Sequence, residues 1–594
     1  MRRSIWVMVM TALLLPWGAD ANQELLSLQK DDKQWVLPSK DYAGTRFSTL
    51  DKINVRTAKN LKPAWTFSTG ALRGHEGQPL VVGSTMYVHS AYPNHVYALD
   101  LTKEGAPIKW RYTPRQDDRA VPVACCDLVH RGVNYVQGKI LMTTLDGQVI
   151  ALDAKTGREV WKTKNADPTR GETMTMAGLV VKDKFIVGVS GGEFGVRGWV
   201  AAYNVNDGKL AWKAYSIGPD EDLKLARDFN SANPHFGQMG EGTKTWPAEH
   251  WKIGGGTTWG WYTYDPDLNL FYYGTGNPGT WNPTPRKGDN KWSMTIFARN
   301  PDTGEAKWGY QKTPWDAWDY DGINENVLVD LKMNGKTVKA LVNFDRNGFA
   351  YTLDRTNGSL LVAQHFVPTN WAKSVDMKTG RPVEDPSKRT KQGADTKDIC
   401  PGAMGGKDQQ PSAYSPRTQL FYTGTNNICM NYEGVEVKYT AGAPYVGANV
   451  LMFAGPGGHL GEFIAWDPTK GKKVWGVKEP FPVWSGTLVT AGDVAFYGTM
   501  DGWFKAVDIK NGNLLWKHKL ASGSIGNPMT YIGPDGKQYV AIYSGVGGWF
   551  GLPIAANLPP QDPFGALGAV GVAYKAGLDK VTTVGGTLHV FVLD

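Results

Sequence analysis

The sequence predicts an all-β fold, an eight-bladed β-propeller, and three observations support this prediction. The chain of 594 residues contains 71 Gly, 35 Pro, 24 Trp and 25 Tyr, a composition typical of many short strands joined by tight turns. A short motif recurs along the chain, and several copies are about 40 to 50 residues apart, the period of a four-stranded blade. Two longer segments, Tyr264 to Asn277 and Tyr414 to Asn427, also repeat each other at an offset of 150 residues.

Residues 1–21 have the pattern of a secretory leader. Arg2 and Arg3 precede a largely apolar run from Ile5 to Trp17, and small residues of a cleavage site follow at positions 19–21. The apolar run is shorter than the ~20 residues needed to span a bilayer, and no later segment of the sequence is long enough. We therefore expect a mature chain of residues 22–594, exported to an oxidising compartment where the four cysteines can form two disulfides.

The recurring motif has the form Ala-x-Asp-x-x-x-Gly, with Asn in place of Asp in some copies and Trp four residues after the Gly. Its copies are Gly157 with Trp161, Gly208 with Trp212, Gly304 with Trp308, Gly471 with Trp475, and Gly512 with Trp516, besides variants at Asp100 to Trp110 and Asp354 to Leu361 and an opening Trp65. Each turn separates two strands, and each Trp can bury a large flat surface between neighbouring blades. We interpret these tryptophans as structural, and their number predicts eight blades.

Segments outside the repeat complete the predicted architecture. The apolar run from Leu588 to Leu593 is expected to pair with an N-terminal strand and close the ring, which would leave no exposed sheet edge. Residues 369–406 and 545–573 do not fit the repeat and are expected to be loop insertions over one face. Function in propellers usually lies on such loops, around the central channel.

The charge of the chain is moderately basic. It carries 64 Lys and Arg against 56 Asp and Glu, a formal net charge of +8. The cations are scattered and form no basic run, so we do not expect nucleic-acid binding. An acidic protein partner is the more plausible consequence of this surface.

Adjacent cysteines are the first candidate for chemistry. Cα atoms joined by a trans peptide are about 3.8 Å apart, so a disulfide between Cys125 and Cys126 would be strained, and strain tends to mark functional sites. A pair of buried free thiols is the alternative. If the two cysteines do pair, Cys400 and Cys429 are left to each other and form a structural disulfide that contributes roughly 3 kcal/mol.

The second candidate is Trp318-Asp319-Tyr320-Asp321-Gly322. In an extended segment alternate side chains point to the same face, so Asp319 and Asp321 could converge on a metal ion while Tyr320 points away. A solvated acidic turn closed by Gly322 is the alternative.

These features together resemble the pyrroloquinoline quinone (PQQ)-dependent alcohol dehydrogenases, and most closely the lanthanide-dependent methanol dehydrogenases. The resemblance covers nearly the whole mature chain. Besides the adjacent cysteines, the tryptophan motif and Trp-Asp-Tyr-Asp-Gly, it is carried by residues 41–48, 74–77, 254–261 and 547–550.

The resemblance implies a site for PQQ, with the planar quinone between the Cys125–Cys126 disulfide and the Trp259 ring. The residues at the edge of the quinone would be Glu76, Arg131, Thr175, Ser190, Gly191, Thr257, Arg346 and Asp408, and Trp484 and Trp549 would cover the pocket. Guanidinium groups suit the carboxylates and carbonyls of this cofactor, because they form paired hydrogen bonds with them.

The resemblance also implies four metal ligands, Glu193, Asn277, Asp319 and Asp321. All four donate oxygen, which hard cations prefer. Calcium-dependent relatives are expected to have a small uncharged residue in place of Asp321, and the additional carboxylate favours a trivalent lanthanide ion over a divalent one. Calcium is the alternative, because it also accepts several carboxylates.

The expected function is oxidation of methanol, and of other short primary alcohols or formaldehyde, in the periplasm. In this hypothesis Asp319 takes the hydroxyl proton, hydride moves to the metal-activated quinone, and Arg346 stabilises the developing oxyanion. No Cys-x-x-Cys-His haem motif occurs, so electrons would leave to a separate c-type cytochrome, and the resemblance suggests a homodimer. The alternatives are a secreted propeller that only scaffolds other proteins and a calcium-dependent alcohol dehydrogenase of broader specificity; a membrane glucose dehydrogenase is disfavoured by the lack of spanning segments.

Overall fold

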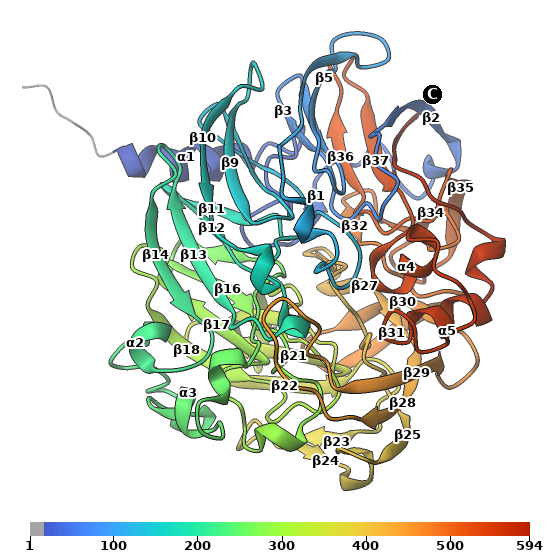
Figure 1. Ribbon diagram of the computed structural model, residues 1–594. Coiled ribbons are helices and arrows are strands. Elements are labelled where there is room, and N and C mark those ends of the chain that lie inside the picture. The colour runs from blue at the N-terminus through green and yellow to red at the C-terminus, as the bar shows by residue number, and fades with distance from the viewer. Residues whose placement is uncertain (1–16, 594) are drawn as a thin grey trace, which may run out of the picture.

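Four-stranded antiparallel sheets follow one another along the chain, and Figure 1 shows them side by side around the molecule. The computed structural model describes residues 17–593. The expected leader, residues 1–21, therefore lies mostly outside the described residues, and helix α1 (Trp17–Leu28) begins within it. In the described part of the chain, seven sheets have four strands and one has five, which confirms the all-β prediction.

The first five sheets are formed by consecutive strands, so each is a simple meander. The first two consist of β3 (Leu80–Val82), β4 (Thr85–His89), β5 (Val96–Asp100) and β6 (Ile108–Tyr112), and of β7 (Asn134–Val136), β8 (Lys139–Thr143), β9 (Gln148–Asp153) and β10 (Glu159–Lys164). The next three consist of β11 (Leu179–Val181), β12 (Lys184–Val187), β13 (Trp199–Asn204) and β14 (Leu210–Tyr215); of β15 (Thr263–Asp265), β16 (Leu270–Gly274), β17 (Thr295–Arg299) and β18 (Ala306–Gln311); and of β19 (Val327–Met333), β20 (Lys336–Phe344), β21 (Phe349–Asp354) and β22 (Leu360–His365).

The last three large sheets depart from this consecutive order. They consist of β26 (Ala413–Ser415), β27 (Leu420–Asn426), β30 (Gly461–Asp467) and β31 (Lys472–Glu479); of β1 (Phe47–Ser48), β32 (Leu488–Thr490), β33 (Val494–Gly498), β34 (Trp503–Asp508) and β35 (Leu514–Lys519); and of β2 (Leu61–Ser68), β38 (Thr587–Leu593), β37 (Gln538–Ser544) and β36 (Met529–Ile532). The short β1 pairs in parallel with β32.

The position of a strand within its sheet matches its residue pattern. In β9 the four central residues Val149, Ile150, Ala151 and Leu152 are all buried, because both faces of this inner strand pack against neighbours. The outer strand β10 instead alternates exposed residues with half-buried ones, as expected for an edge with one solvated face. Hydrophobic residues therefore gather between and inside the sheets.

Tryptophans of the recurring motif pack on the glycine turn of the next sheet. A Cβ atom at Gly157 would lie 2.6 Å from the Trp110 ring, and one at Gly208 would lie 2.5 Å from the Trp161 ring. Both glycines have a positive φ, 72° and 69°. Glycine is therefore required here for two reasons: it adopts this backbone conformation readily, and it has no Cβ atom that would collide with the ring. The Trp110 Nε1 also donates to the Ala154 carbonyl at 3.0 Å. The same contact recurs for Gly304 with Trp212, Gly358 with Trp308, and Gly512 with Trp475.

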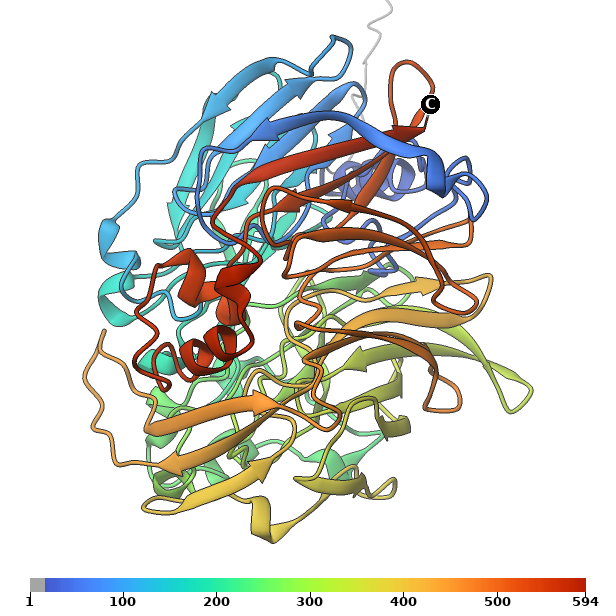
Figure 2. The same cartoon turned by 90° about the vertical axis from the view of Figure 1, so that its right-hand side faces the viewer.

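The two ends of the described chain meet in one sheet, as predicted. Strand β38 pairs antiparallel with β2 along its length, from Thr587 opposite Ser68 to Leu593 opposite Leu61. Figure 2 shows this contact as a red strand beside a blue one. Strand β38 also pairs with β37, so both of its edges are hydrogen-bonded, and the predicted pairing of Leu588 to Leu593 with an N-terminal strand is confirmed.

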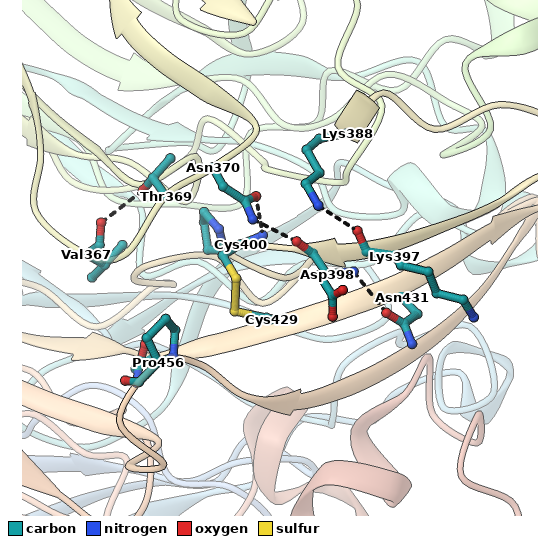
Figure 3. The surroundings of a disulfide bond; sticks show 12 residues. Val367, Thr369, Asn370, Lys388, Lys397, Asp398, Cys400, Cys429, Asn431 and Pro456 are labelled. Atoms are coloured by element: carbon teal, nitrogen blue, oxygen red, sulfur yellow. Dashed lines mark hydrogen bonds between the residues drawn. A yellow bond between two sulfur atoms is a disulfide. The ribbon is translucent and has the colours of Figure 1, made fainter. Parts of the chain in front are cut away.

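Both predicted insertions have local structure. The first, residues 369–406, holds β23 (Ala372–Val375), β24 (Pro382–Glu384) and β25 (Asp395–Ile399), and β25 joins a three-stranded sheet with β28 (Ile428–Gly434) and β29 (Ala448–Ala454). Cys400 and Cys429 form a disulfide that ties β25 to β28 (Figure 3). The second, residues 545–573, forms α4 (Gly548–Ala555) and most of α5 (Ala569–Lys575), which pack on each other.

The remaining helices are short. In the described part of the chain they are the α-helices α2 (Asp220–Leu223) and α3 (Glu241–Lys244), each of four residues, and nine 3-10 helices of three or four residues. Between Trp17 and Leu593, no helix has both the length and the apolar character needed to cross a membrane.

Candidate active site

Loops from many different sheets converge on one cavity. Its walls come from segments as distant in sequence as Glu76 and Trp549, and several are charged. The lining residues are Glu76, Val123, Ala124, Cys125, Cys126, Asp127, Val129, Arg131, Thr173, Thr175, Ser190, Gly191, Glu193, Trp259, Asp319, Asp321, Arg346, Asp408 and Trp549. Most of the residues predicted for the cofactor and metal sites are therefore neighbours in space.

Adjacent cysteines form one part of the wall. Cys125 and Cys126 are bonded to each other, with Cα atoms 3.8 Å apart, and within residues 17–593 no cysteine is free. The expected pairing of all four cysteines in two disulfides is confirmed. The vicinal disulfide and the half-buried Trp259 both face the cavity, which supplies the two apolar surfaces that a planar conjugated ligand requires.

Arg131 organises the polar edge of the cavity. Its Nη2 lies 2.9 Å from Glu76 Oε2, and its Nη1 donates to Thr175 Oγ1 at 2.7 Å. The guanidinium also lies 4.9 Å from the centre of the Trp259 ring, a cation–π contact. The Thr175 hydroxyl is in turn 3.3 Å from Ser190 Oγ. Burial raises the pKa of Glu76 to about 7 although Arg131 lowers it, so the Glu76 carboxyl group is largely removed from water.

The Asp319-Tyr320-Asp321 segment forms a turn and not the extended strand that would place alternate side chains on one face. Asp319 and Asp321 have positive φ angles of 65° and 29°. The reason is Asp316, whose carboxylate accepts hydrogen bonds from the backbone N–H groups of Trp318, Asp319 and Tyr320 and so folds the chain back.

Two aspartates of this turn nevertheless converge, because Arg346 lies between them. Its Nη1 is 2.6 Å from Asp321 Oδ2 and 3.6 Å from Asp319 Oδ2. Tyr320 points away, as predicted, and donates to the Pro401 carbonyl at 2.8 Å.

Arg346 also links the turn to the roof of the cavity. Its Nε lies 3.3 Å from Asp408 Oδ1, and its guanidinium lies 5.3 Å from the centre of the Trp549 ring. Burial lowers the pKa of Arg346, but the carboxylates around it raise that pKa by more, so the side chain stays cationic. Arg346 is thus fixed against one wall with its charge directed at the acidic group.

The carboxylates carry more negative charge than Arg346 balances. Burial raises the pKa of Asp319 well above its ordinary value, and burial also raises that of Asp321, to about 7, and that of Glu193. Arg346 opposes each shift, while repulsion between the carboxylates adds to it. A cation bound among them would relieve this repulsion.

Several oxygen atoms here lack a hydrogen-bond partner and so fit a hard cation. They include Asp319 Oδ1 and Asn277 Oδ1, both buried. Asn277 is tied to the acidic turn because its backbone N–H donates to Asp321 Oδ1 at 2.7 Å. A Cβ atom at Gly192 would lie 2.8 Å from Asn277 Oδ1, so the glycine leaves room for the amide. Within residues 17–593, no three His, Cys, Asp or Glu side chains are grouped so that they could by themselves hold a metal ion, and Asp321 pairs with Arg346 instead.

Three predicted residues lie beside the cavity instead of in its lining. They are Asn277, Thr257 and Trp484. The Thr257 Oγ1 atom is buried without a hydrogen bond and would be 3.1 Å from a Cβ at Gly276. Trp484 is fully buried, and its Nε1 would be 3.2 Å from a Cβ at Gly548.

Sequence reasoning missed Asp127 and Thr173, both of which line the cavity. For Asp127 the only available signal was its position directly after the cysteine pair. Thr173 had no signal, because its backbone pairs with Ser190 across a bridge that only the fold creates.

Comparison with known proteins places this geometry in context. A family model described as glucose/ethanol/alcohol dehydrogenase, β-propeller domain, of the PQQ type, matches residues 35–400 and 468–540. The lanthanide-dependent methanol dehydrogenase of Methylacidiphilum fumariolicum is 67% identical over 97% of this chain and 95% of its own. Subunit 1 of the methanol dehydrogenase [cytochrome c] of Methylorubrum extorquens is 52% identical over 100% of this chain and 96% of its own.

A solved structure agrees with these relatives. A europium-containing methanol dehydrogenase has 66% sequence identity and a TM-score of 0.96, and the alignment covers 96% of this chain and all of that one.

Proposed function

The chain belongs to the PQQ family of glucose, ethanol and alcohol dehydrogenases with a β-propeller domain, and on this premise we propose that it oxidises methanol with PQQ and a lanthanide ion. The electrons would pass to a c-type cytochrome, as the name of one relative indicates for that protein. Other short primary alcohols or formaldehyde are further candidate substrates, because discrimination per methylene group is limited to about 1 to 3 kcal/mol.

The observation that carries this proposal is the cavity itself. One cavity is lined by a vicinal disulfide, two indole rings, two arginines and six carboxylates. Arg131 and Arg346 suit the acid groups and carbonyls of PQQ, while Cys125–Cys126 and Trp259 suit its flat faces. We assign Glu76, Thr175, Ser190, Gly191, Thr257 and Asp408 to the polar edge of the cofactor, and Trp484 and Trp549 to the cover of the pocket.

We assign the metal ion to Glu193, Asn277, Asp319 and Asp321. These residues offer three carboxylates and one amide, all oxygen donors, and two of their buried oxygens have no hydrogen bond. Three carboxylates at one site favour a trivalent ion, because the attraction scales with its charge. Asp321 contributes the charge that separates this assignment from a calcium site.

When bound, PQQ and its ion supply a two-electron acceptor whose carbonyl is polarised by a Lewis acid. Two side chains of the protein would then take part in the reaction. Asp319 would accept the hydroxyl proton of the alcohol, and Arg346, fixed by Asp408 and Trp549, would stabilise negative charge that develops on oxygen. The buried setting of both side chains excludes water and strengthens these interactions.

The finer description of the fold is also a proposal. We infer that the eight large sheets are blades of a propeller and that the tryptophan contacts dock each blade on the next, because the same glycine and tryptophan meet at successive interfaces. We further assign residues 1–21 to a cleaved leader and residues 22–594 to one catalytic domain located in the periplasm. A homodimer and an acidic cytochrome that docks on the basic surface complete the proposal.

Reconstitution of the mature chain tests the proposal directly. The chain is loaded with PQQ plus either lanthanum or calcium, and methanol-dependent dye reduction is followed in each sample. We expect activity with lanthanum only. Activity with calcium only would overturn the metal assignment, and no activity with either ion would favour a non-catalytic scaffold.

A further inference from the structure

We propose that Asp127 is a positioning residue that ties three chain segments together around the cofactor pocket, an inference that rests on the proposed function. Asp127 directly follows the Cys125–Cys126 disulfide and lines the same cavity. Its side chain is completely buried, with an exposed fraction of 0%. Asp127 is not among the residues assigned above to the cofactor, the metal ion or catalysis.

Both carboxylate oxygens of Asp127 are used for contacts with distant parts of the chain. Oδ2 accepts from the Gly74 N–H at 2.9 Å and from the Gly548 N–H at 3.2 Å. Oδ1 accepts from the Leu128 N–H at 2.8 Å and lies 3.6 Å from Nη1 of Arg73. Hydrogen bonds to an ionised acceptor are stronger than neutral ones, so this single side chain is a firm junction.

Each segment held by Asp127 carries a residue of the pocket. Gly74 is two residues before Glu76, which pairs with Arg131. Gly548 is the first residue of α4 and precedes Trp549, which packs on Arg346. Asp127 therefore fixes the polar edge, the disulfide wall and the roof of the pocket relative to one another. A carboxylate at the start of α4 also suits the partial positive charge of a helix N-terminus.

The fit around Asp127 is tight. A Cβ atom at Gly74 would lie 2.6 Å from Asp127 Oδ2, and one at Gly547 would lie 2.1 Å from it, so both approaches require glycine. Asp127 itself has a φ of 88°, which non-glycine residues seldom adopt. Such a conformation persists where the surroundings over-determine it, and it clusters at functional sites.

Asp146 provides a matched control. It is also buried and accepts hydrogen bonds from the Gln148 side chain and the Asp117 N–H, at 2.7 and 3.1 Å. Neither Asp146 nor these partners line the cavity. A purely structural role for Asp127 predicts that loss of either carboxylate has similar consequences.

The test compares Asp127→Asn with Asp146→Asn in the full chain. Asparagine keeps the shape of the side chain, but its NH2 group cannot accept, so at least one backbone N–H loses its partner and Arg73 loses a counter-charge. We expect amide hydrogen exchange at residues 547–550 to become at least tenfold faster in Asp127→Asn. We also expect PQQ to leave the loaded enzyme at least fivefold faster on dilution, followed by its absorbance, whereas Asp146→Asn changes neither rate.

The proposal would be overturned if Asp127→Asn exchanged its amide hydrogens and released PQQ as slowly as the parent protein. It would also be overturned if Asp127→Asn and Asp146→Asn changed these rates equally. Asp127→Ala removes both acceptor oxygens of the side chain, so its amide exchange and its release of PQQ should both be faster than those of Asp127→Asn. Slower rates in Asp127→Ala than in Asp127→Asn would also overturn the proposal. If the parent protein fails to retain PQQ, the proposed function is wrong, and the exchange rates of the cofactor-free protein alone decide the role of Asp127.

Discussion

Removal of the Cys400–Cys429 disulfide should lower the stability of the protein without changing its chemistry. The bond connects residues 29 positions apart and lies where β25 meets β28, beside Asn370 and Asn431 (Figure 3). A cross-link stabilises mainly by restricting the unfolded chain. For a closed loop of this length the chain-entropy relation gives about 3.6 kcal/mol at 25 °C.

This free energy translates into a modest thermal shift because the protein is large. Unfolding entropy is about 2.1 cal/mol/K per residue, so a chain of 594 residues has about 1.2 kcal/mol/K in total. A loss of about 3.6 kcal/mol therefore lowers the Tm by about 3 °C. The acidic turn is held by Asp316 and Arg346, and its hydrogen bond to the residue after Cys400, from the Tyr320 hydroxyl to the Pro401 carbonyl, involves neither sulfur atom, so turnover per folded molecule should be retained.

Calorimetry of the Cys400→Ala/Cys429→Ala variant measures this shift, with the dye assay as the second readout. Val383→Ala, which truncates an exposed side chain on β24 of the same insertion, is the control and should leave the Tm unchanged. A Tm equal to that of the parent would refute the loop-entropy reasoning. If the variant shows the expected fall in Tm but also loses turnover per folded molecule, the purely structural role of the bond is refuted.

Four further perturbations test the site and the fold. Asp319→Ala should abolish methanol-dependent dye reduction, because the proton acceptor is lost; near-normal turnover would contradict that role. Asp321→Ala should shift the metal preference from lanthanum towards calcium in a reconstitution series, and unchanged lanthanide dependence would count against the charge argument. Trp212→Ala removes a buried ring that stacks on Phe271 and should cost about 3 to 5 kcal/mol, seen as a Tm lowered by several degrees; a shift below one degree would show that docking contributes little. Burial raises the pKa of Glu76 to about 7, so its contribution to stability is present below the unfolded value near 4.5 and is lost as the pH rises through about 7; the Tm of the cofactor-free protein should therefore fall over this range, and Glu76→Gln should make the fall shallower.

The sequence by itself determined the class of the fold and the identity of most pocket residues. Strand patterns and turn glycines are local, so their period of 2 and their spacing can be read without knowledge of contacts. The tryptophan and glycine of successive motifs are in contact, and the interpretation of these tryptophans as structural stays a prediction. The resemblance carried by Cys125-Cys126 and by Trp318 to Gly322 supplied the residues that the structure then brings to one cavity.

Only the tertiary structure decided how those residues meet. The acidic turn bends because the Asp316 carboxylate accepts hydrogen bonds from three backbone N–H groups, an alternative to strand hydrogen bonds that an aspartate side chain offers to the backbone near it. Arg346 reaches both aspartates from a turn in another sheet, and Asp127 joins segments separated by 53 and 421 residues. Contacts between residues this distant depend on how the sheets are arranged, and no local pattern encodes them.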